Sequence, residues 1–477
     1  MRRYIAALAA AAIVGAGAID ARSYKRGVSE NQFSITQEMT PLAPGVSWYY
    51  NWGNVPGGNI RDFDGFEFIP MCWNSSYNVD NIRKYCKEHP EVKYILGFNE
   101  PNFTNQANMT PAAAAQKWPA VVELARELGL KIVAPALNYS PNAPYQSPTK
   151  WFDEFVALVG KDSFDYVAIH GYGGFGVIKT LATEFHERYG KDVWVTEFCY
   201  WPGESGHVAP DTQISSMVET VTWLETTPWI YRYAWFKAKG AYNSNSAPNY
   251  GLIISKTGYD ERELSPQGKV YVYMSEFDSE IWNAVGTAVN AVDYINADKL
   301  ALGEGANAAC GKPIEISRFN AGSYADYQFD VPEAGDYRLV LTVTGEGEPV
   351  RFDPTLQVQT VKDGNATAVS ASKQFTLPGN NTDYVEREIP VTLAAGRQTL
   401  RIADMAPYTP SGIRISTVTL RSAGSGVDDI AVDGDNITVN VYTLQGIMVR
   451  ENVPASEATA GLPAGIYVAG GRKIVVK

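Results

Sequence analysis

The chain has 477 residues, of which 45% are hydrophobic, so it is long enough to fill the cores of two or three domains. Its formal net charge is -12 and its isoelectric point is about 5.0. A nucleic-acid partner would call for a basic face or stripe, so this charge argues against one. It favours a neutral or cationic ligand.

The N-terminus has the pattern of a secretory signal peptide. Arg2 and Arg3 precede an alanine-rich apolar stretch, and Ala16-Gly17-Ala18 supplies the small residues of a cleavage site. A membrane anchor is the alternative, but the stretch is shorter than the ~20 apolar residues of a spanning helix, and no later segment is long enough. We predict a signal peptide over residues 1–22, no membrane span, and a secreted or cell-surface monomer.

The cysteines are too few for a disulfide scaffold in a chain of this size. There are four of them: Cys72, Cys86, Cys199 and Cys310. A disulfide between Cys72 and Cys86 stays open as an alternative, while buried free thiols are favoured.

Apolar runs alternate with helix-like stretches from about Gly45 to Ser255, which predicts an α/β fold, namely a (β/α)8 TIM barrel over residues 23–275. Seven strands are expected, at Gly45–Trp52, Phe66–Trp73, Val92–Asn99, Lys131–Asn138, Phe164–Tyr172, Asp192–Phe198 and Ile230–Phe236. We place an eighth, short strand within Gly53–Gly65. Thr110 as N-cap and Pro111 open a helix that runs to Leu128, and Asp211 opens another that runs to Glu225.

After about Tyr273 the helical periodicity fades and short alternating runs take over. Examples are Ala325–Val331, Asp336–Val343, Tyr384–Val391 and Gln398–Ile402. These runs predict an all-β sandwich over residues 283–422. A flexible linker, Ser422–Gly426, separates it from a small C-terminal β domain over residues 427–477.

Two glutamates are the candidate catalytic residues. Glu100, in Gly97-Phe98-Asn99-Glu100-Pro101-Asn102, and Glu197, in Val193-Trp194-Val195-Thr196-Glu197-Phe198, each end an apolar run that predicts a buried strand. Barrel enzymes build their sites at the C-terminal ends of strands. Two carboxyl groups there can cleave a glycosidic bond, because one protonates the leaving oxygen and the other stabilises or attacks the oxocarbenium-like centre.

Further polar and aromatic residues stand at predicted strand ends. The Asn99 amide is placed to bond a sugar hydroxyl, and His170 and Tyr172 are placed to orient Glu197 or to bond the sugar. For His170 a hydrogen-bonded core histidine is the alternative. Sugar rings stack on indoles, so we expect Trp235 to form a platform that Trp52, Trp73 and Trp201 extend, with core packing as the alternative for each tryptophan.

The two glutamate segments resemble the acid/base strand and the nucleophile strand of retaining glycosidases built on (β/α)8 barrels. More closely, the chain resembles glycoside hydrolase family 128, the glycosyl hydrolase catalytic core family of endo-β-1,3-glucanases, over residues 40 to 275. The resemblance is carried by Gly45–Trp52, by Phe68–Trp73, by Leu96–Asn102 and by Val195–Phe198. It implies that Glu100 is the acid/base and Glu197 the nucleophile.

The C-terminal segments carry looser resemblances. Gly322–Tyr337 and Leu393–Arg401 resemble carbohydrate-binding β-sandwich modules of family six, although the loops are poor in aromatic residues and a spacer with no sugar site is the alternative. Residues 427–477 resemble the sorting domain of type IX secretion, through Tyr442–Gly446 and Leu462–Tyr467. That resemblance implies a bacterial enzyme that is handled by the secretion machinery.

The resulting prediction is a retaining endo-acting hydrolase of β-1,3-glucan with two catalytic glutamates. The chain shows no Cys/His ligand cluster, no phosphate-binding glycine loop and no dinucleotide fingerprint, so no metal or cofactor is expected. One alternative is a hydrolase of the same clan that acts on another β-glycan, such as mannan or xylan. The other is a non-enzymatic glycan-binding surface protein.

Overall fold

The structure, a computed structural model, describes residues 22–57, 60, 65–203, 206–255, 262–305, 311–345, 353–378, 380–407, 412–423, 438–443, 447–454, 457–463, 465–469 and 472–476. The predicted signal peptide, apart from Arg22, and Cys310 lie outside these residues. Cys72, Cys86 and Cys199 are free, buried thiols, so the alternative of a Cys72–Cys86 disulfide does not hold.

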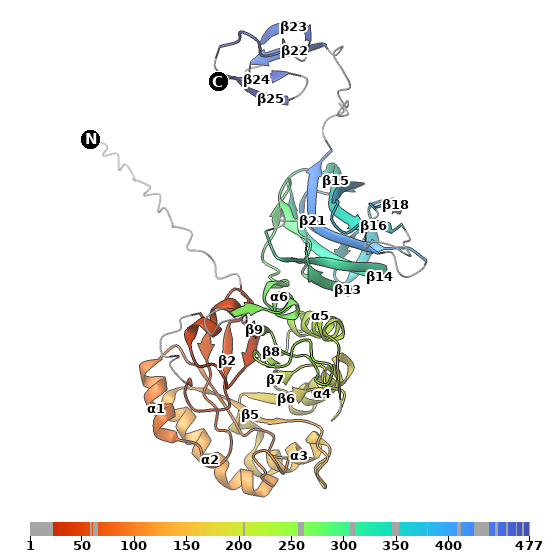
Figure 1. Cartoon of the computed structure of the whole chain (residues 1–477). Coiled ribbons are helices and arrows are strands. Elements are labelled where there is room, and N and C mark those ends of the chain that lie inside the picture. Colours follow the sequence, from red (N-terminus) through yellow and green to blue (C-terminus); the bar gives the residue numbers. More distant parts are fainter. Residues whose placement is uncertain are drawn as a thin grey trace, which may run out of the picture. The chain divides into compact units, whose positions relative to one another are not determined.

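Eight parallel strands form the centre of the N-terminal part (Figure 1). They follow one another around the sheet in the order β3, β2, β1, β8, β7, β6, β5, β4, and a parallel bridge between Met71 and Leu96 joins the two edges. This arrangement fits the (β/α)8 barrel that the sequence predicts. The strands are β1 (Arg26–Ser29), β2 (Trp48–Tyr50), β3 (Glu67–Phe68), β4 (Tyr94–Leu96), β5 (Lys131–Leu137), β6 (Tyr166–Gly171), β7 (Val193–Phe198) and β8 (Ile230–Phe236).

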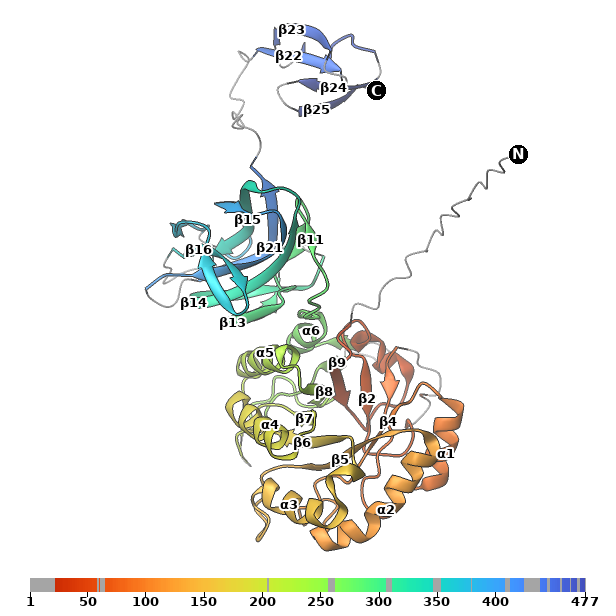
Figure 2. The ribbon, with the colours of Figure 1, turned by 180° about the vertical axis from the view of Figure 1, so that it is seen from behind.

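Helices surround the outside of this sheet (Figures 1 and 2). They are α1 (Val79–Glu88), α2 (Pro111–Leu128), α3 (Pro148–Val159), α4 (Phe175–Tyr189), α5 (Pro210–Thr226) and α6 (Pro266–Tyr273), with short 3-10 turns η1 (Thr36–Glu38), η2 (Thr40–Leu42) and η3 (Lys161–Ser163). The hydroxyl of Thr110 accepts the N–H of Ala113 at 3.2 Å, which confirms the predicted N-cap of α2. Helix α5 begins one residue before the predicted Asp211.

The eighth strand lies at a different place from the one predicted. It is β1, before the first predicted strand, and the described residues of Gly53–Gly65 contain no strand. Its four residues, Arg-Gly-Val-Ser, show too little apolar character to be recognised. Gly27 is required here because a Cβ would lie 2.3 Å from the Trp48 indole, and the buried Arg26 is paired with Glu225 at 3.4 Å.

Aromatic side chains fill the amino-terminal end of the barrel. Tyr94, Tyr166 and Tyr231, from the first residues of β4, β6 and β8, pack against Trp194 with ring centroids 5.2 to 5.9 Å apart. The guanidinium of Arg232 lies 4.8 Å from the Tyr94 ring centroid and bonds Glu67 at 2.7 Å. The barrel is therefore a packed core at this end, and its cavity lies at the other end.

An antiparallel, strand-rich region follows the barrel, after a small pair formed by β9 (Ile253–Ser255) and β10 (Arg262–Leu264). Its strands are β11 (Asn283–Ala284), β12 (Ala288–Asn290), β13 (Asn296–Glu304), β14 (Ile314–Val331), β15 (Gly335–Gly345), β16 (Thr355–Lys362), β17 (Asn365–Ala368), β18 (Lys373–Gln374), β19 (Val385–Leu393), β20 (Gly396–Asp404) and β21 (Ile413–Ser422). Their hydrogen bonds connect all eleven into one sheet. The region agrees with the predicted β class, and its division into two packed sheets stays a prediction.

The chain divides into two compact units, at Arg421 and Ser422. The second unit contains a four-stranded antiparallel sheet of β22 (Thr438–Thr443), β23 (Met448–Pro454), β24 (Gly465–Ala469) and β25 (Arg472–Val476), in the order β23, β22, β24, β25. Most of the predicted linker, from Gly424 onward, lies outside the described residues.

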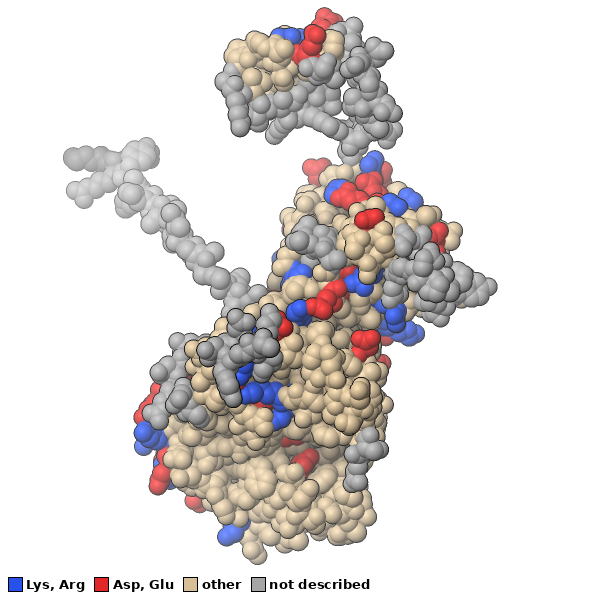
Figure 3. All heavy atoms as spheres, in the orientation of Figure 1, with Lys and Arg blue, Asp and Glu red and all other residues tan. Residues whose placement is uncertain are grey.

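The described surface carries charges of both signs. On the face shown in Figure 3, acidic and basic side chains are interspersed rather than gathered into a large patch of one sign. Within the described residues, no helix combines the length and the apolar character needed to cross a bilayer.

Candidate active site

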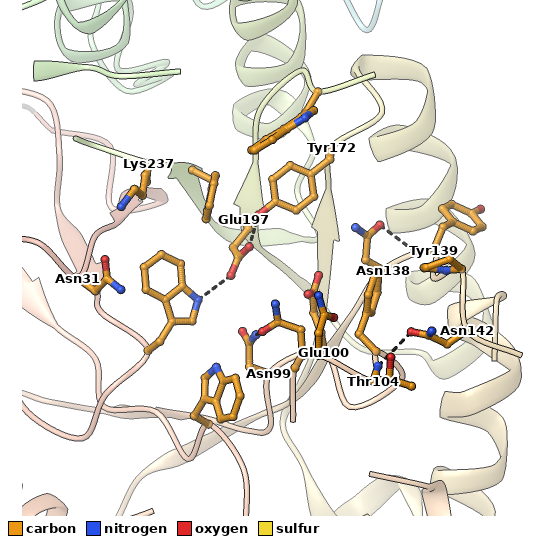
Figure 4. Close-up of a pocket in the computed structure, with 18 of the residues that line it drawn as sticks. Asn31, Asn99, Glu100, Thr104, Asn138, Tyr139, Asn142, Tyr172, Glu197 and Lys237 are labelled. Carbon is orange, nitrogen blue, oxygen red and sulfur yellow. Dashed lines mark hydrogen bonds between the residues drawn. The ribbon is translucent and has the colours of Figure 1, made fainter. Parts of the chain in front are cut away.

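A cavity of about 1020 Å³ lies at the carboxyl ends of the barrel strands, and both candidate glutamates line it (Figure 4). Its wall consists of loop residues that follow several different strands, which is the usual construction of a barrel site. The lining residues are Asn31, Trp52, Trp73, Asn99, Glu100, Phe103, Thr104, Asn105, Gln106, Asn138, Tyr139, Pro141, Asn142, Tyr172, Glu197, Trp201, Gly203, Phe236 and Lys237.

Glu100 follows β4, where the chain is held tightly against β5. A Cβ on Gly97 would lie 2.9 Å from the carbonyl oxygen of Val133, so only glycine permits this approach. The Glu100 N–H donates to the carbonyl of Ala136 at 2.9 Å, and its backbone has φ +42. A glutamate rarely adopts this left-handed conformation, so the surrounding contacts impose it and aim its side chain into the cavity.

Glu197 belongs to β7 and is 4% exposed. Its Oε1 accepts hydrogen bonds from the Tyr50 hydroxyl at 3.0 Å and from the Trp52 indole N–H at 2.7 Å. Its Oε2 accepts a hydrogen bond from the Tyr172 hydroxyl. Three neutral donors thus fix the carboxylate and favour its ionised form.

His170 lies between the two glutamates and is fully buried. Its Nδ1 lies 2.8 Å from Glu100 Oε1 and 3.4 Å from Glu197 Oε2. Its Nε2 is buried without a hydrogen-bond partner. The side chain does not line the cavity, and its contacts with both glutamates favour a positioning role, which stays a prediction.

Burial and neighbouring charges shift the pKa values of Glu197 and His170. Burial raises the pKa of the Glu197 carboxyl most, Glu100 raises it further, and His170 and the hydroxyl of Tyr172 oppose the shift, so that the pKa lies above its ordinary value. Burial lowers the pKa of His170, but the charges of Glu197 and Glu100 outweigh it, and the net direction is upward. The pKa values of Glu197 and His170 therefore depend on each other.

One oxygen of each glutamate and one ring nitrogen of His170 all lie within 4.8 Å of one another. Among the described residues, these three side chains are close enough together to hold a metal ion. The same distance is short enough for both carboxyl groups to contact the two sides of a single bond in a substrate.

The structure brings most of the predicted aromatic residues to the cavity. Trp52, Trp73, Trp201 and Tyr172 line it, and Asn99 lines it with an Oδ1 that is buried and unpartnered. Sugar contact by these residues stays a prediction. Trp201 stacks on Tyr250, with ring centroids 5.8 Å apart.

Trp235 is the exception, and the prediction of a Trp235 platform is wrong. Its side chain is 1% exposed, does not line the cavity, and donates its indole N–H to the carbonyl of Tyr250 at 2.8 Å. Successive side chains of a strand point to opposite faces, so Ala234 joins the core inside the barrel while Trp235 joins the core between strands and helices. Phe236, the next residue, lines the cavity in its place.

Tyr50 is the main site residue that the sequence analysis missed. It lies two residues from Trp52 in the run Trp48-Tyr49-Tyr50-Asn51-Trp52. The period of two along a strand places Trp48, Tyr50 and Trp52 on the same face, and this signal was available. Lys237, Asn31 and the loop amides carried no recognisable sequence signal.

The model of the glycosyl hydrolase catalytic core family matches residues 27–271, slightly more than half of the 477 residues. The match contains both Glu100 and Glu197. The protein is therefore a glycoside hydrolase. It belongs to the glycosyl hydrolase catalytic core family.

Several solved structures are similar to the chain. An endo-β-1,3-glucanase of glycoside hydrolase family 128, subgroup II, from Pseudomonas viridiflava is 32% identical and has a TM-score of 0.47, with 53% of this chain and 98% of that chain covered. A subgroup II enzyme from Sorangium cellulosum is 31% identical, with a TM-score of 0.45 and coverages of 52% and 98%. A subgroup I enzyme from Amycolatopsis mediterranei, in complex with laminaritriose, is 26% identical, with a TM-score of 0.42 and coverages of 52% and 98%.

Among curated proteins, Alkali-sensitive linkage protein 1 of Schizosaccharomyces pombe is 25% identical over 232 residues. That match covers 48% of this chain and 40% of the relative, so the chain spans less than half the length of that protein.

Proposed function

We propose that the protein is a retaining, endo-acting hydrolase of β-1,3-glucan. The substrate is inferred from the sequence motifs that resemble family 128, a family whose solved members named above are described as β-1,3-glucanases. The aromatic residues around an open cavity suit a neutral sugar chain, because the C–H faces of pyranose rings pack on indoles.

The spacing of the two carboxyl groups supports the retaining mechanism. Retaining glycosidases hold these groups about 5–5.5 Å apart, whereas inverting enzymes need about 6.5–9.5 Å to admit a water molecule. An oxygen of Glu100 lies within 4.8 Å of an oxygen of Glu197. This close approach favours direct attack by a carboxylate over attack by a water molecule held between the two groups.

The roles of the two glutamates follow from their hydrogen bonds. Glu197 accepts from Tyr50, Trp52 and Tyr172, which suits the ionised nucleophile, whereas the side-chain contact of Glu100 is His170. Glu100 donates its proton to the glycosidic oxygen while Glu197 bonds the anomeric carbon, and the C–O bond to the leaving sugar breaks. Glu100 then removes a proton from water, the water oxygen replaces Glu197 on the same carbon, and both carboxyl groups return to their starting states.

The remaining parts of the chain belong to the same proposal. Residues 23–275 act as the catalytic domain, residues 283–422 form a carbohydrate-binding-like or spacer module, and residues 427–477 act as a sorting domain. The N-terminal sequence pattern and the C-terminal resemblance support a bacterial secreted or surface-anchored enzyme.

The test is the release of reducing ends by the purified chain from linear β-1,3-glucan, with β-1,4-mannan, xylan and cellulose in parallel. We expect short oligosaccharides from β-1,3-glucan, with the anomeric configuration of the new end retained in an NMR time course. Cleavage of another polymer would discard the substrate, and inversion would discard the mechanism. If a folded protein cleaves none of the polymers, the result would favour the alternative of a glycan-binding protein.

A further inference from the structure

A second cavity, of about 510 Å³, lies between the barrel helices and the antiparallel region. Its lining residues come from α4, α5, β13 and β14, and none of them lines the catalytic cavity. Helix α5 and strand β13 lie side by side in both ribbon views, within one compact unit (Figures 1 and 2). This α5–β13 cavity is therefore separate from the two glutamates, and its β13 and β14 walls lie beyond the family match, which ends at residue 271.

Three aromatic side chains line the α5–β13 cavity, and all three are half-buried. Phe175, the first residue of α4, meets Trp223 of α5 edge to face, with ring centroids 6.1 Å apart. Tyr324 of β14 lies under the guanidinium of Arg401, which is 3.6 Å from the ring centroid. Half-buried rings around a cavity suit a sugar chain, because the C–H faces of pyranose rings pack on aromatic rings.

Two carboxylates in the same cavity have oxygens that no donor occupies. Within the described residues, Glu219 of α5 and Asp298 of β13 accept no hydrogen bond and form no ion pair. Partial burial raises the pKa of Glu219, the nearby charge of Asp298 raises it further, and the charge of Lys179 opposes the shift. Two neighbouring carboxylates disfavour an anionic ligand and need a ligand with hydrogen-bond donors, which the hydroxyls of a neutral sugar supply.

A β-bulge aims this part of β13 at the cavity. Residues 296 to 300 all line it, although successive side chains of a regular strand point to opposite faces. The register between β13 and β14 shifts just after Asp298, and Lys299 there has φ +55. The Ser323 hydroxyl holds the bulge through a hydrogen bond to the Lys299 carbonyl at 2.6 Å. The wall that carries Asp298 is therefore in place before a ligand binds, which lowers the entropic cost of binding.

We propose that the α5–β13 cavity is a second binding site for the β-glucan polymer, separate from the catalytic cavity. The rings of Phe175, Trp223 and Tyr324 pack on the faces of the sugars. The carboxylates of Glu219 and Asp298 accept hydrogen bonds from sugar hydroxyls. The inference rests on the proposed function, since it takes the same polymer as the ligand. A long chain held here is kept close to the catalytic cavity, whereas a short oligosaccharide needs the catalytic cavity alone.

The first test separates binding of the polymer from cleavage of a short substrate. In a Glu197→Gln background, which prevents cleavage, depletion of the protein by insoluble linear β-1,3-glucan measures the apparent Kd. We expect Trp223→Ala to raise this Kd about 3- to 10-fold, and Trp223→Phe, which keeps a ring, to change it less than about 2-fold. Without the Glu197→Gln change, Trp223→Ala should leave kcat/KM on linear β-1,3-linked glucohexaose within about 2-fold.

A second variant removes the acceptors and leaves the rings in place. Glu219→Ala combined with Asp298→Ala should also raise the Kd for the insoluble glucan about 3- to 10-fold. The matched control is Glu123→Ala combined with Glu187→Ala, because these exposed helix residues carry the same charge and line neither cavity. We expect the control to bind like the unchanged protein. Melting curves of each variant show whether it is folded.

Unchanged glucan binding in both Trp223→Ala and the Glu219/Asp298 double variant would overturn the second site, and so would an equal loss of kcat/KM on glucohexaose. If CaCl2 raises the melting midpoint of the unchanged protein but not of that double variant, while glucan binding is the same in both, the cavity is a cation site instead. If the unchanged protein neither cleaves nor binds β-1,3-glucan, the proposed function falls together with the second site. Cleavage of glucohexaose with unaltered binding by the variants overturns the second site alone.

Discussion

Buried carboxylates are paired differently at the barrel cavity and in the antiparallel region. In the antiparallel region, Asp326 is bound by both arms of Arg401 at 2.7 and 2.9 Å, and the fully buried Glu315 is bound by Arg414 at 2.7 Å. At the barrel cavity, Glu100 and Glu197 lie close together, and His170 is the basic side chain that pairs with them. Charge that is neutralised holds a fold together, whereas charge left unneutralised near a cavity is available for chemistry.

The sharpest way to test this contrast is Glu197→Gln. The amide keeps the shape of the side chain but cannot attack the anomeric carbon, so we expect kcat to fall about 1,000-fold or more while the protein stays folded. Reducing-sugar assays and circular dichroism measure the two quantities. An active Glu197→Gln enzyme would contradict the assignment of the nucleophile.

Two tryptophans extend the contrast from charges to aromatic rings. Trp235→Ala leaves a hole in the core and an unpaired Tyr250 carbonyl, so we expect the free energy of unfolding to fall by about 3–5 kcal/mol. Trp73→Ala, at the cavity, should instead lower kcat/KM and leave stability nearly unchanged. Urea unfolding and initial rates on both variants measure this, and a reversed pattern would restore Trp235 to the site.

Arg414→Ala tests the neutralised charge in the antiparallel region. The change leaves Glu315 buried with the Tyr384 hydroxyl but without a cation, so we expect the free energy of unfolding to fall by about 3 kcal/mol. The kcat on glucan should stay within about 2-fold, because nothing at the barrel mouth changes. Denaturant unfolding is the measurement. A large loss of activity with unchanged stability would show that the contrast is wrong.

The pH dependence of stability is the smallest expected effect. Because the pKa of Glu197 is raised, its contribution to stability declines as the pH rises above the ordinary value of 4.5. The raised pKa of His170 acts in the same direction, since its contribution is complete below 6.5 and is lost as the pH rises through the raised value. Both shifts predict a thermal midpoint that falls from about pH 5 to about pH 8.

Glu197→Gln should flatten that decline, by about 1–3 °C over the same pH interval. Differential scanning fluorimetry in a series of buffers measures the slopes for the two proteins. Parallel slopes would mean that the cluster of Glu100, His170 and Glu197 does not control the pH dependence.

Much of the fold could be predicted because local signals agreed with the final structure. The Thr110 cap and Pro111 marked the start of α2, and seven apolar runs marked seven barrel strands. Strand β1 was not predicted, because its position depends on tertiary contacts. Arg26 is buried there through a hydrogen bond to the Tyr233 hydroxyl and a pairing with Glu225, partners about 200 residues away that no local pattern reveals.

The candidate site was predictable to the extent that strand ends could be located. Glu100 and Glu197 end their strands visibly, and the structure brings them together at the cavity. The prediction for Trp235 failed because the direction of its side chain depends on the register of β8, and a shift by one residue reverses that direction. The orientations of the Gln106, Asn138 and Asn142 amides could not be predicted, because hydrogen bonds within and between two loops set them.

The aromatic layer at the amino-terminal end of the barrel also limits how a ligand can reach the site. Tyr94, Tyr166, Tyr231 and Trp194 pack together there and close that end of the barrel interior. The barrel interior therefore offers no passage from one end to the other, and a polymer in the cavity has to bind at the carboxyl ends of the strands. In the proposed reaction, each product leaves at the same end of the barrel at which the substrate entered, and this release is a step separate from the chemistry.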